Sequence, residues 1–237
     1  MNPATYSLDS MLIEGAEMLG VGLDESQRAR LLAYLKYFIQ WNSIYNLSAI
    51  RDPQQMLIQH ILDSLAIVPV LSSCPISSVL DIGSGGGLPG VVLAISKPDW
   101  RVILNDAVQK KTAFLTHLKT VLPLPNVQVL ASRVELLPSS DGERIAAQAK
   151  SLQNVLVSRA FSSLSRLVSL TRHLVAPGVS IWAMKGVFPE AEISEFKAKA
   201  LDGMHIARVV KLHVPFLKAE RHLVQITCEP AHVGARG

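Results

Sequence analysis

The spacing of hydrophobic and polar positions changes near residue 72. Across residues 7–71, apolar side chains recur at helical spacings of three, four and seven. Asp24 precedes one such stretch, and its side chain can cap a helix by accepting hydrogen bonds from the first free N–H groups. The apolar face of that helix is predicted to contain Leu31, Leu35, Phe38 and Tyr45.

A second helix in this region is predicted to begin at Asp52-Pro53, since an aspartate cap followed by proline is typical of helix starts. We expect it to run to about Val70, before Ser72-Ser73-Cys74-Pro75 interrupts the pattern. Its buried side is expected to carry Met56, Leu57, Ile61, Leu65 and Val68. The pattern therefore predicts a helical N-terminal extension over residues 1–72.

From residue 78 onward, strand and helix patterns alternate, which favours an α/β fold with a Rossmann-like, mostly parallel sheet over residues 73–237. The predicted strands are 78–83, 101–106, 127–131, 153–158, 179–184, 206–212 and 222–228. The predicted helices between them are 88–97, 108–121, 163–175 and 189–201. The last two strands are too close for a parallel crossover, so we expect an antiparallel C-terminal hairpin. The polar residues 138–152 are predicted to form a loop, with room for a short helix.

Composition narrows the class of protein. The 237 residues are 49% hydrophobic and 18% charged, which is typical of a globular chain. No apolar stretch approaches the roughly 20 residues that span a bilayer, the N-terminus lacks a secretion-signal layout, and two isolated cysteines are too few for a disulfide framework or zinc site. We therefore expect a cytoplasmic protein with no membrane contact and no metal. A net charge of +4 permits nucleic-acid binding without demonstrating it.

The run VLDIGSGGGLPG at residues 79–90 is the strongest chemical motif. An apolar strand leads to a carboxylate, Asp81, and then to a glycine-rich turn that contains Gly83, Gly85 and Gly87. Leu88 follows, close to the start of a helix. Glycines let a backbone approach a ligand closely, and a helix start offers free N–H groups. The motif predicts a nucleotide-type ligand at the carboxyl end of the first strand.

The residues around this turn favour S-adenosylmethionine. Leu88 stands where a dinucleotide-binding turn has its third glycine, and the charge of Asp81 suits a cationic ligand better than a pyrophosphate. Asp106 ends the next strand, 25 residues later, where a carboxylate can accept hydrogen bonds from ribose hydroxyls. NAD and the absence of a cofactor remain the alternatives.

Basic residues end several of the predicted strands at the edge where the ligand is expected. Arg159 and Lys185 follow two parallel strands, and Arg221 begins the last, antiparallel strand at the same edge. Arg133 adds a fourth candidate. Because the cofactor favoured here has no phosphate, these cations predict a substrate that carries phosphates. The alternative is that they are solvated or paired with acids such as Glu135 and Glu220.

Candidate catalytic side chains are few. Cys74 and Cys228 do not stand in a Pro-Cys pair, and the fourth strand is followed by Ser158-Arg159-Ala160-Phe161 rather than by an amine-methylating loop. These absences favour a ring nitrogen or a small nucleophile as methyl acceptor. For a ring nitrogen, alignment with the methyl group supplies most of the acceleration. His60 and His222 are each expected to have a packing role, and contact between His60 and the cofactor is the alternative.

Several blocks of sequence, in order, resemble the ribosomal RNA small-subunit methyltransferase G family, also called glucose-inhibited division protein B. The resemblance covers nearly the whole chain. The blocks are WN at 41–42, YNL at 45–47, IRDP at 50–53, HILDS at 60–64, DIGSGGGLPG at 81–90, SRVE at 132–135, SRA at 158–160, KG at 185–186 and ERHLV at 220–224.

The resemblance implies a class I methyltransferase fold and transfer of a methyl group from S-adenosylmethionine to N7 of one guanine in the 530 loop of 16S rRNA. It implies cofactor contacts at Gly83, Leu88, Asp106, Val134, Glu135 and Arg159. It makes Arg133, Lys185 and Arg221 candidates for contact with RNA or the target base, and no residue a certain catalyst. We take a monomer as the default, because the sequence does not determine the oligomeric state.

Two features depart from the family pattern. Lys111 replaces an arginine after the second strand, and the segment 138–152 is longer than usual. A methyltransferase that acts on another RNA or a small molecule stays an alternative. So does a ribosome-associated protein that binds the cofactor without catalysis.

Overall fold

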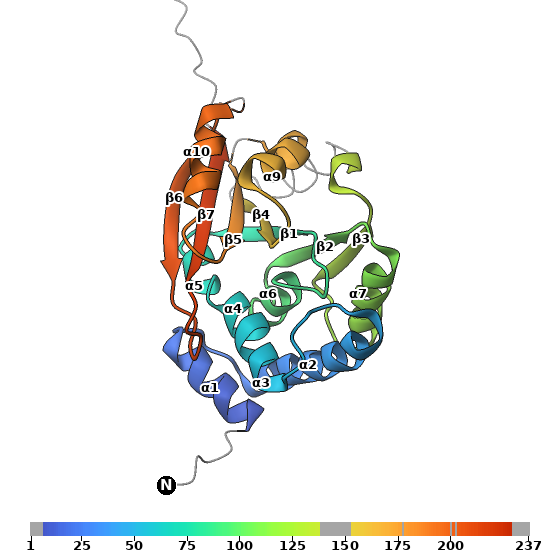
Figure 1. Cartoon of the computed structure of the whole chain (residues 1–237). Coiled ribbons are helices and arrows are strands. Elements are labelled where there is room, and N and C mark those ends of the chain that lie inside the picture. Colours follow the sequence, from blue (N-terminus) through green and yellow to red (C-terminus); the bar gives the residue numbers. More distant parts are fainter. Residues whose placement is uncertain (1–6, 138–152, 177, 200, 202, 229–237) are drawn as a thin grey trace, which may run out of the picture.

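The computed structural model describes residues 7–137, 153–176, 178–199, 201 and 203–228. Its centre is a seven-stranded sheet with the order β3-β2-β1-β4-β5-β7-β6 (Figure 1). The strands are β1 Ile76–Ile82, β2 Arg101–Asp106, β3 Val127–Ala131, β4 Gln153–Arg159, β5 Val179–Lys185, β6 Met204–Leu212 and β7 Arg221–Cys228. Strand β7 is antiparallel to both of its neighbours, and the other pairs are parallel. The predicted fold class and C-terminal hairpin are confirmed, with strand ends within two residues of those predicted. The predicted loop at 138–152 lies outside the described residues.

Helices cover both faces of the sheet. Neighbouring strand residues point to opposite faces, so Val79 belongs to a buried cluster with α6 and α7, and Leu80 to a second cluster with α9 and α10. These helices are α6 Gly90–Ser96, α7 Gln109–Val121, α9 Leu164–Thr171 and α10 Glu190–Lys199. The helix predicted at 163–175 was too long, because its last turn tightens into a 3-10 helix, η3 Arg172–Leu174.

The predicted cap of the first long helix in the N-terminal extension is confirmed. Helix α2 Glu25–Tyr45 follows the short helix α1 Leu8–Met18, and the Asp24 carboxylate accepts a 2.7 Å hydrogen bond from the Gln27 N–H. Leu31, Leu35 and Phe38 are buried as predicted. The prediction for Tyr45 was wrong: it is exposed and its ring lies against Trp41, because the last turn of α2 extends beyond the core.

The prediction of one continuous helix from Pro53 to Val70 was wrong. The Asp52 cap is confirmed, but the segment divides into α3 Pro53–Met56, a π-helix η1 Leu57–Leu62, α4 Asp63–Leu65 and α5 Val68–Leu71. Pro69 has no N–H to continue the earlier hydrogen-bond pattern, so α5 begins anew just before it. The five side chains predicted on the buried side are all buried. A π-turn is a common feature of functional sites, and this one carries His60.

The N-terminal extension packs directly against the sheet domain. The larger buried cluster contains Tyr34 and Phe38 from α2 together with Val91 from α6 and Phe114 from α7. In Figure 1, α2 and α4 lie beside α6 and α7. Within the described residues, no helix combines the length and the apolar character that crossing a membrane requires.

Candidate functional site

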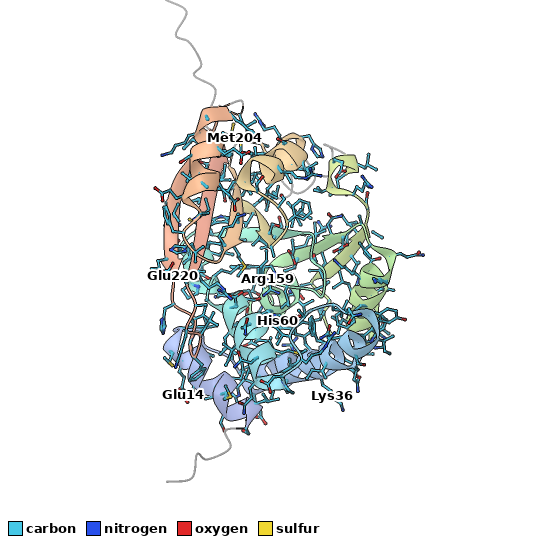
Figure 2. The ribbon with its side chains drawn as sticks, viewed as in Figure 1. Glu14, Lys36, His60, Arg159, Met204 and Glu220 are labelled. Carbon is cyan, nitrogen blue, oxygen red and sulfur yellow. The ribbon has the colours of Figure 1, made fainter. Side chains whose placement is uncertain are left out.

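A continuous cleft lies at the carboxyl ends of the parallel strands. It has two hollows, of about 620 and 440 Å³, which share Gly83, Lys111 and Ala160 in their walls. The larger hollow is bounded on one side by the N-terminal extension. His60 from that extension and Arg159 from β4 both lie near the middle of the molecule (Figure 2). This is the position where open α/β sheets bind their ligands.

The glycine-rich turn forms the floor of the cleft. Gly83 has a φ of +69°, and a Cβ built on it would lie 2.5 Å from the Phe161 ring, so a side chain is excluded there. The backbone N–H of Gly85 donates a 2.9 Å hydrogen bond to Asp106. The turn is thus held in a shape that presents bare backbone to the cleft. Leu88 also lines it, whereas Gly87 packs against Val91 beneath it.

Helix α2 supports the turn from behind. The Tyr34 hydroxyl donates a 2.8 Å hydrogen bond to the carbonyl oxygen of Gly86, and burial raises the pKa of this hydroxyl, which keeps its proton available. Phe38 lies against Gly86, where a Cβ would overlap its ring. The N-terminal extension therefore fixes the predicted cofactor loop as well as bounding the cleft.

Replacing Tyr34 with phenylalanine is expected to lower the free energy of unfolding by about 1–2 kcal/mol, because the Gly86 carbonyl loses its buried donor. Cofactor affinity is expected to fall about fivefold as the loop loosens. Urea unfolding and calorimetric titration with S-adenosylmethionine measure the two effects. Tyr37→Phe, on the same helix, is the matched control and is expected to match wild type in both. Equal affinity of Tyr34→Phe and wild type would contradict a support role.

Asp81 lies behind the loop and has no exposed surface. One carboxylate oxygen accepts a 2.9 Å hydrogen bond from the Gly90 N–H, and the other has no partner among the described residues. Burial raises the pKa of this carboxyl to about 7, against the smaller opposing effect of the Gly90 hydrogen bond. A buried, half-satisfied carboxylate beside the cleft fits a cationic ligand such as S-adenosylmethionine.

The smaller hollow is lined by the residues predicted to bind the ribose and adenine of that cofactor. Asp106 lines it and accepts hydrogen bonds from the Gly85 and Val108 N–H groups, at 2.9 and 2.8 Å. A carboxylate has about four lone-pair sites, which leaves capacity for two ribose hydroxyls. Val134 and Glu135 line the same hollow. The Lys111 ammonium lies 3.9 Å from Asp106, and this departure from the family pattern lines both hollows.

Three of the predicted cations line the larger hollow and form what we call the cation wall: Arg159, Lys185 and Arg221. Each has an acidic partner. Arg159 and Arg221 share Asp63, at 3.3 and 2.8 Å, while Lys185 pairs with Glu192 at 2.8 Å. The wall therefore combines three cations with two carboxylates and keeps a net positive charge.

The remaining cation, Arg133, lines the smaller hollow and pairs with Glu135 at 3.6 Å, as the alternative in the sequence interpretation had it. The prediction that Glu220 pairs with the cations of the cleft was wrong, since its carboxylate pairs with Lys211 on the outside of the hairpin. Neighbouring residues of an extended chain point to opposite faces, which turns Arg221 inward and Glu220 outward.

His60 lines the larger hollow, so its expected role in packing was incomplete. Its Nε2 lies 2.9 Å from the Ser48 hydroxyl, and its ring lies against Phe38. Burial, together with the smaller effect of the nearby Arg159 charge, lowers the pKa of His60 to about 4. The imidazole is therefore neutral near pH 7 and adds no positive charge to the cleft. His222 packs as predicted, with Nδ1 2.8 Å from the Gly186 carbonyl.

Replacing His60 with glutamine is expected to reduce the loss of stability in acid. Between pH 6.5 and 4 the unfolded chain protonates this histidine while the folded chain does not, so stability is present above pH 6.5 and falls below it by up to about 3 kcal/mol. Unfolding free energies of both proteins at pH 7 and pH 4.5 measure the effect. An unchanged difference between the two pH values would show that His60 is not the group responsible.

Sequence reasoning missed the contribution of the N-terminal extension to the cleft. Ser48, Ile50, Gln59 and Asp63 all line the larger hollow. The blocks at 50–53 and 60–64 were visible in the sequence, but a local pattern does not show which distant residues they face. Within the ranges that the structure describes, no group of three or more histidine, cysteine or acidic side chains could hold a metal ion.

Comparisons with known proteins agree with this geometry. A family model described as rRNA small subunit methyltransferase G matches residues 27–224. The chain is 52% identical over 224 residues to "Ribosomal RNA small subunit methyltransferase G" of Burkholderia multivorans, covering 94% of each chain. It is 51% identical over 226 residues to the protein of the same name from Burkholderia thailandensis, covering 95% of this chain and 94% of the relative.

Solved structures share the fold at low sequence identity. A mutant of MtNAS in complex with S-adenosylmethionine matches with a TM-score of 0.54 and 15% identity, covering 96% of this chain and 86% of that one. An S-adenosylmethionine-dependent methyltransferase from Aquifex aeolicus matches with a TM-score of 0.50 and 17% identity, covering 74% and 93%. These likenesses confirm the class I methyltransferase fold.

Proposed function

The chain belongs to the rRNA small subunit methyltransferase G family, and from this premise we propose that it methylates N7 of one guanine in the 530 loop of 16S rRNA. S-adenosylmethionine is the methyl donor of this reaction. The observation that carries the proposal is the single cleft that joins the glycine-rich turn and Asp106 to the cation wall. We further propose that the protein works in the cytoplasm, as a monomer.

Each end of the cleft has a defined task in this proposal. S-adenosylmethionine supplies, when bound, a methyl group made electrophilic by its sulfonium. Asp106 would accept hydrogen bonds from the ribose, Val134 and Glu135 would border the adenine, and Asp81 would offset the positive charge of the methionine end. Gly83, Gly85 and Leu88 would provide the surface on which the ligand lies.

The larger hollow would take the target nucleotide. Guanine N7 carries a lone pair and is nucleophilic without loss of a proton, so no general base is required. The protein accelerates such a reaction by alignment, which is worth several orders of magnitude in rate. The cation wall would hold the RNA by its phosphates or base oxygens, and the neutral His60 would border the same space.

A labelled-methyl assay with a panel of acceptors tests the proposed class of substrate. The panel contains small ribosomal subunits lacking native methylation, protein-free 16S rRNA, large subunits, tRNA and small-molecule acceptors. We expect label only in small-subunit rRNA, whether free or in the particle. Label in another acceptor would contradict the proposed substrate. Cofactor binding without transfer to any acceptor would show that the protein binds the cofactor without catalysis.

A further inference from the structure

One buried carboxylate connects the N-terminal extension to two arginines of the sheet domain. Asp63, the first residue of α4, is 3% exposed. Its Oδ1 accepts a 2.8 Å hydrogen bond from Nε of Arg221, and its Oδ2 accepts one of 3.3 Å from Nη1 of Arg159. Arg159 ends β4 and Arg221 begins β7, on either side of β5. A single carboxylate therefore sets the separation of two guanidinium groups.

Backbone carbonyls complete this arrangement. Nη1 of Arg159 also donates to the carbonyl oxygen of Gln59 at 2.9 Å, and Nη1 of Arg221 donates to that of Glu220 at 2.8 Å. Among the described residues, the Nη2 group of each arginine has no partner, and both side chains are 21% exposed in the wall of the cleft. Each guanidinium is thus held by some of its donors and has other N–H donors left for an incoming oxygen.

We propose that Asp63 is a positioning residue for RNA, which holds the free N–H donors of Arg159 and Arg221 in the orientation that receives phosphate or base oxygens of the substrate. The inference rests on the proposed function and states how the residues that would bind its substrate are held in position. A guanidinium whose position is fixed before binding loses less freedom on forming each hydrogen bond. The carboxylate gains its effect through the arginines and does not itself contact the substrate.

Charge gives Asp63 a second effect on the same site. With the carboxylate present, the two arginines carry a net charge of +1, which attracts RNA. Without it they carry +2 and repel each other, and they face a cofactor that has its own sulfonium charge. An asparagine at this position presents one acceptor and one donor, so it can hold only one of the two guanidiniums.

The test compares Asp63→Asn with Glu195→Gln. Both changes remove one negative charge from an ion pair, but the Glu195 carboxylate pairs with Lys199 on α10 and lines neither hollow. For Asp63→Asn we expect kcat on small subunits to fall about 10- to 100-fold, since small misplacements of binding groups have effects of this size. KM is expected to stay equal or to fall, because the cleft becomes more positive. Glu195→Gln is expected to keep the wild-type kcat.

Two further readouts separate positioning from a structural role. The slope of log K for RNA binding against log salt concentration is expected to steepen by about one in Asp63→Asn, as one more phosphate contact forms without an internal competitor. In an Arg221→Ala background, Asp63→Asn is expected to reduce kcat by a smaller factor than in wild type. S-adenosylmethionine affinity and thermal stability, measured on the same samples, report whether the variant is folded.

Three results would overturn the inference while wild type remains active: an unchanged kcat, an equal loss in the Arg221→Ala background, or losses of cofactor affinity and stability that account for the whole effect. An inactive wild type would instead contradict the proposed function, which keeps the two failures distinguishable.

Discussion

Replacement of Asp81 by asparagine is expected to lower the affinity for S-adenosylmethionine about 100-fold while stabilising the ligand-free protein at pH 8. The loss of affinity follows from charge. Asp81 is fully buried behind the glycine-rich turn, and one of its oxygens has no partner among the described residues. A cationic ligand in the cleft offsets that charge, and the neutral amide of asparagine has no charge to offset.

The gain in stability follows from the same burial. The pKa of this carboxyl is raised from a usual 3.8 to about 7, so the folded state favours the protonated form. Its stabilising contribution is present below pH 3.8, declines as the pH rises, and is lost above pH 7, where the buried group is charged. The difference between the two pKa values corresponds to about 4 kcal/mol. Asparagine removes this cost while its carbonyl still accepts from Gly90.

Calorimetric titration with S-adenosylmethionine and thermal unfolding at pH 5 and pH 8 measure both effects. The stabilisation is expected to be larger at pH 8 than at pH 5. In wild type, cofactor affinity is expected to rise as the pH increases through 7, and this rise is expected to be absent from the variant. Asp99→Asn, at an exposed position, is the matched control and is expected to match wild type. If Asp81→Asn binds S-adenosylmethionine with the wild-type affinity, Asp81 has no role in cofactor binding.

Arg221→Ala is expected to leave cofactor binding intact and to reduce methyl transfer to small subunits about 100-fold. Arg221 lines the larger hollow and is absent from the smaller one, where Asp106, Val134 and Glu135 lie. Loss of one charged hydrogen-bonding group in a binding site typically costs about 2–3 kcal/mol, to which misalignment of the substrate adds.

Single-turnover transfer with saturating S-adenosylmethionine measures this effect without interference from cofactor affinity. Lys211→Ala is the matched control, because Lys211 is a cation of the same hairpin whose partner, Glu220, lies outside the cleft. The control is expected to transfer at the wild-type rate. If Arg221→Ala also does so, the cation wall is a solvated surface and RNA binds elsewhere.

The arrangement of the residues proposed for the cofactor was predictable because its signals are local. The carboxylate, the glycines and the helix start lie within residues 79–90, and Asp106 ends the next strand in the sheet. The alternation of strands and helices indicated a parallel sheet, in which the carboxyl ends of the strands lie at one edge. The predicted positions of Arg159, Lys185 and Arg221 along one cleft followed from that topology.

The partners of those cations were not predictable in the same way. Asp63 is 96 residues from Arg159 and 158 residues from Arg221, and it comes from a helical segment whose sequence pattern shows only a buried face. The π-turn that precedes it changes which side chains face the cleft, while the hydrophobic spacing still resembles one α-helix. Hydrophobic periodicity therefore predicted neither the long-range ion pairs of Asp63 nor the local change from α-helix to π-helix.

The position of the transferred methyl group tests the central proposal most directly. Small subunits lacking native methylation would be incubated with the protein and labelled S-adenosylmethionine, and the rRNA then cleaved by chemistry specific for 7-methylguanosine and mapped. We predict one cleavage site, at a guanine of the 530 loop, that carries the label in full. Label at another atom or another nucleotide would contradict the proposed alignment of guanine N7 in the cleft.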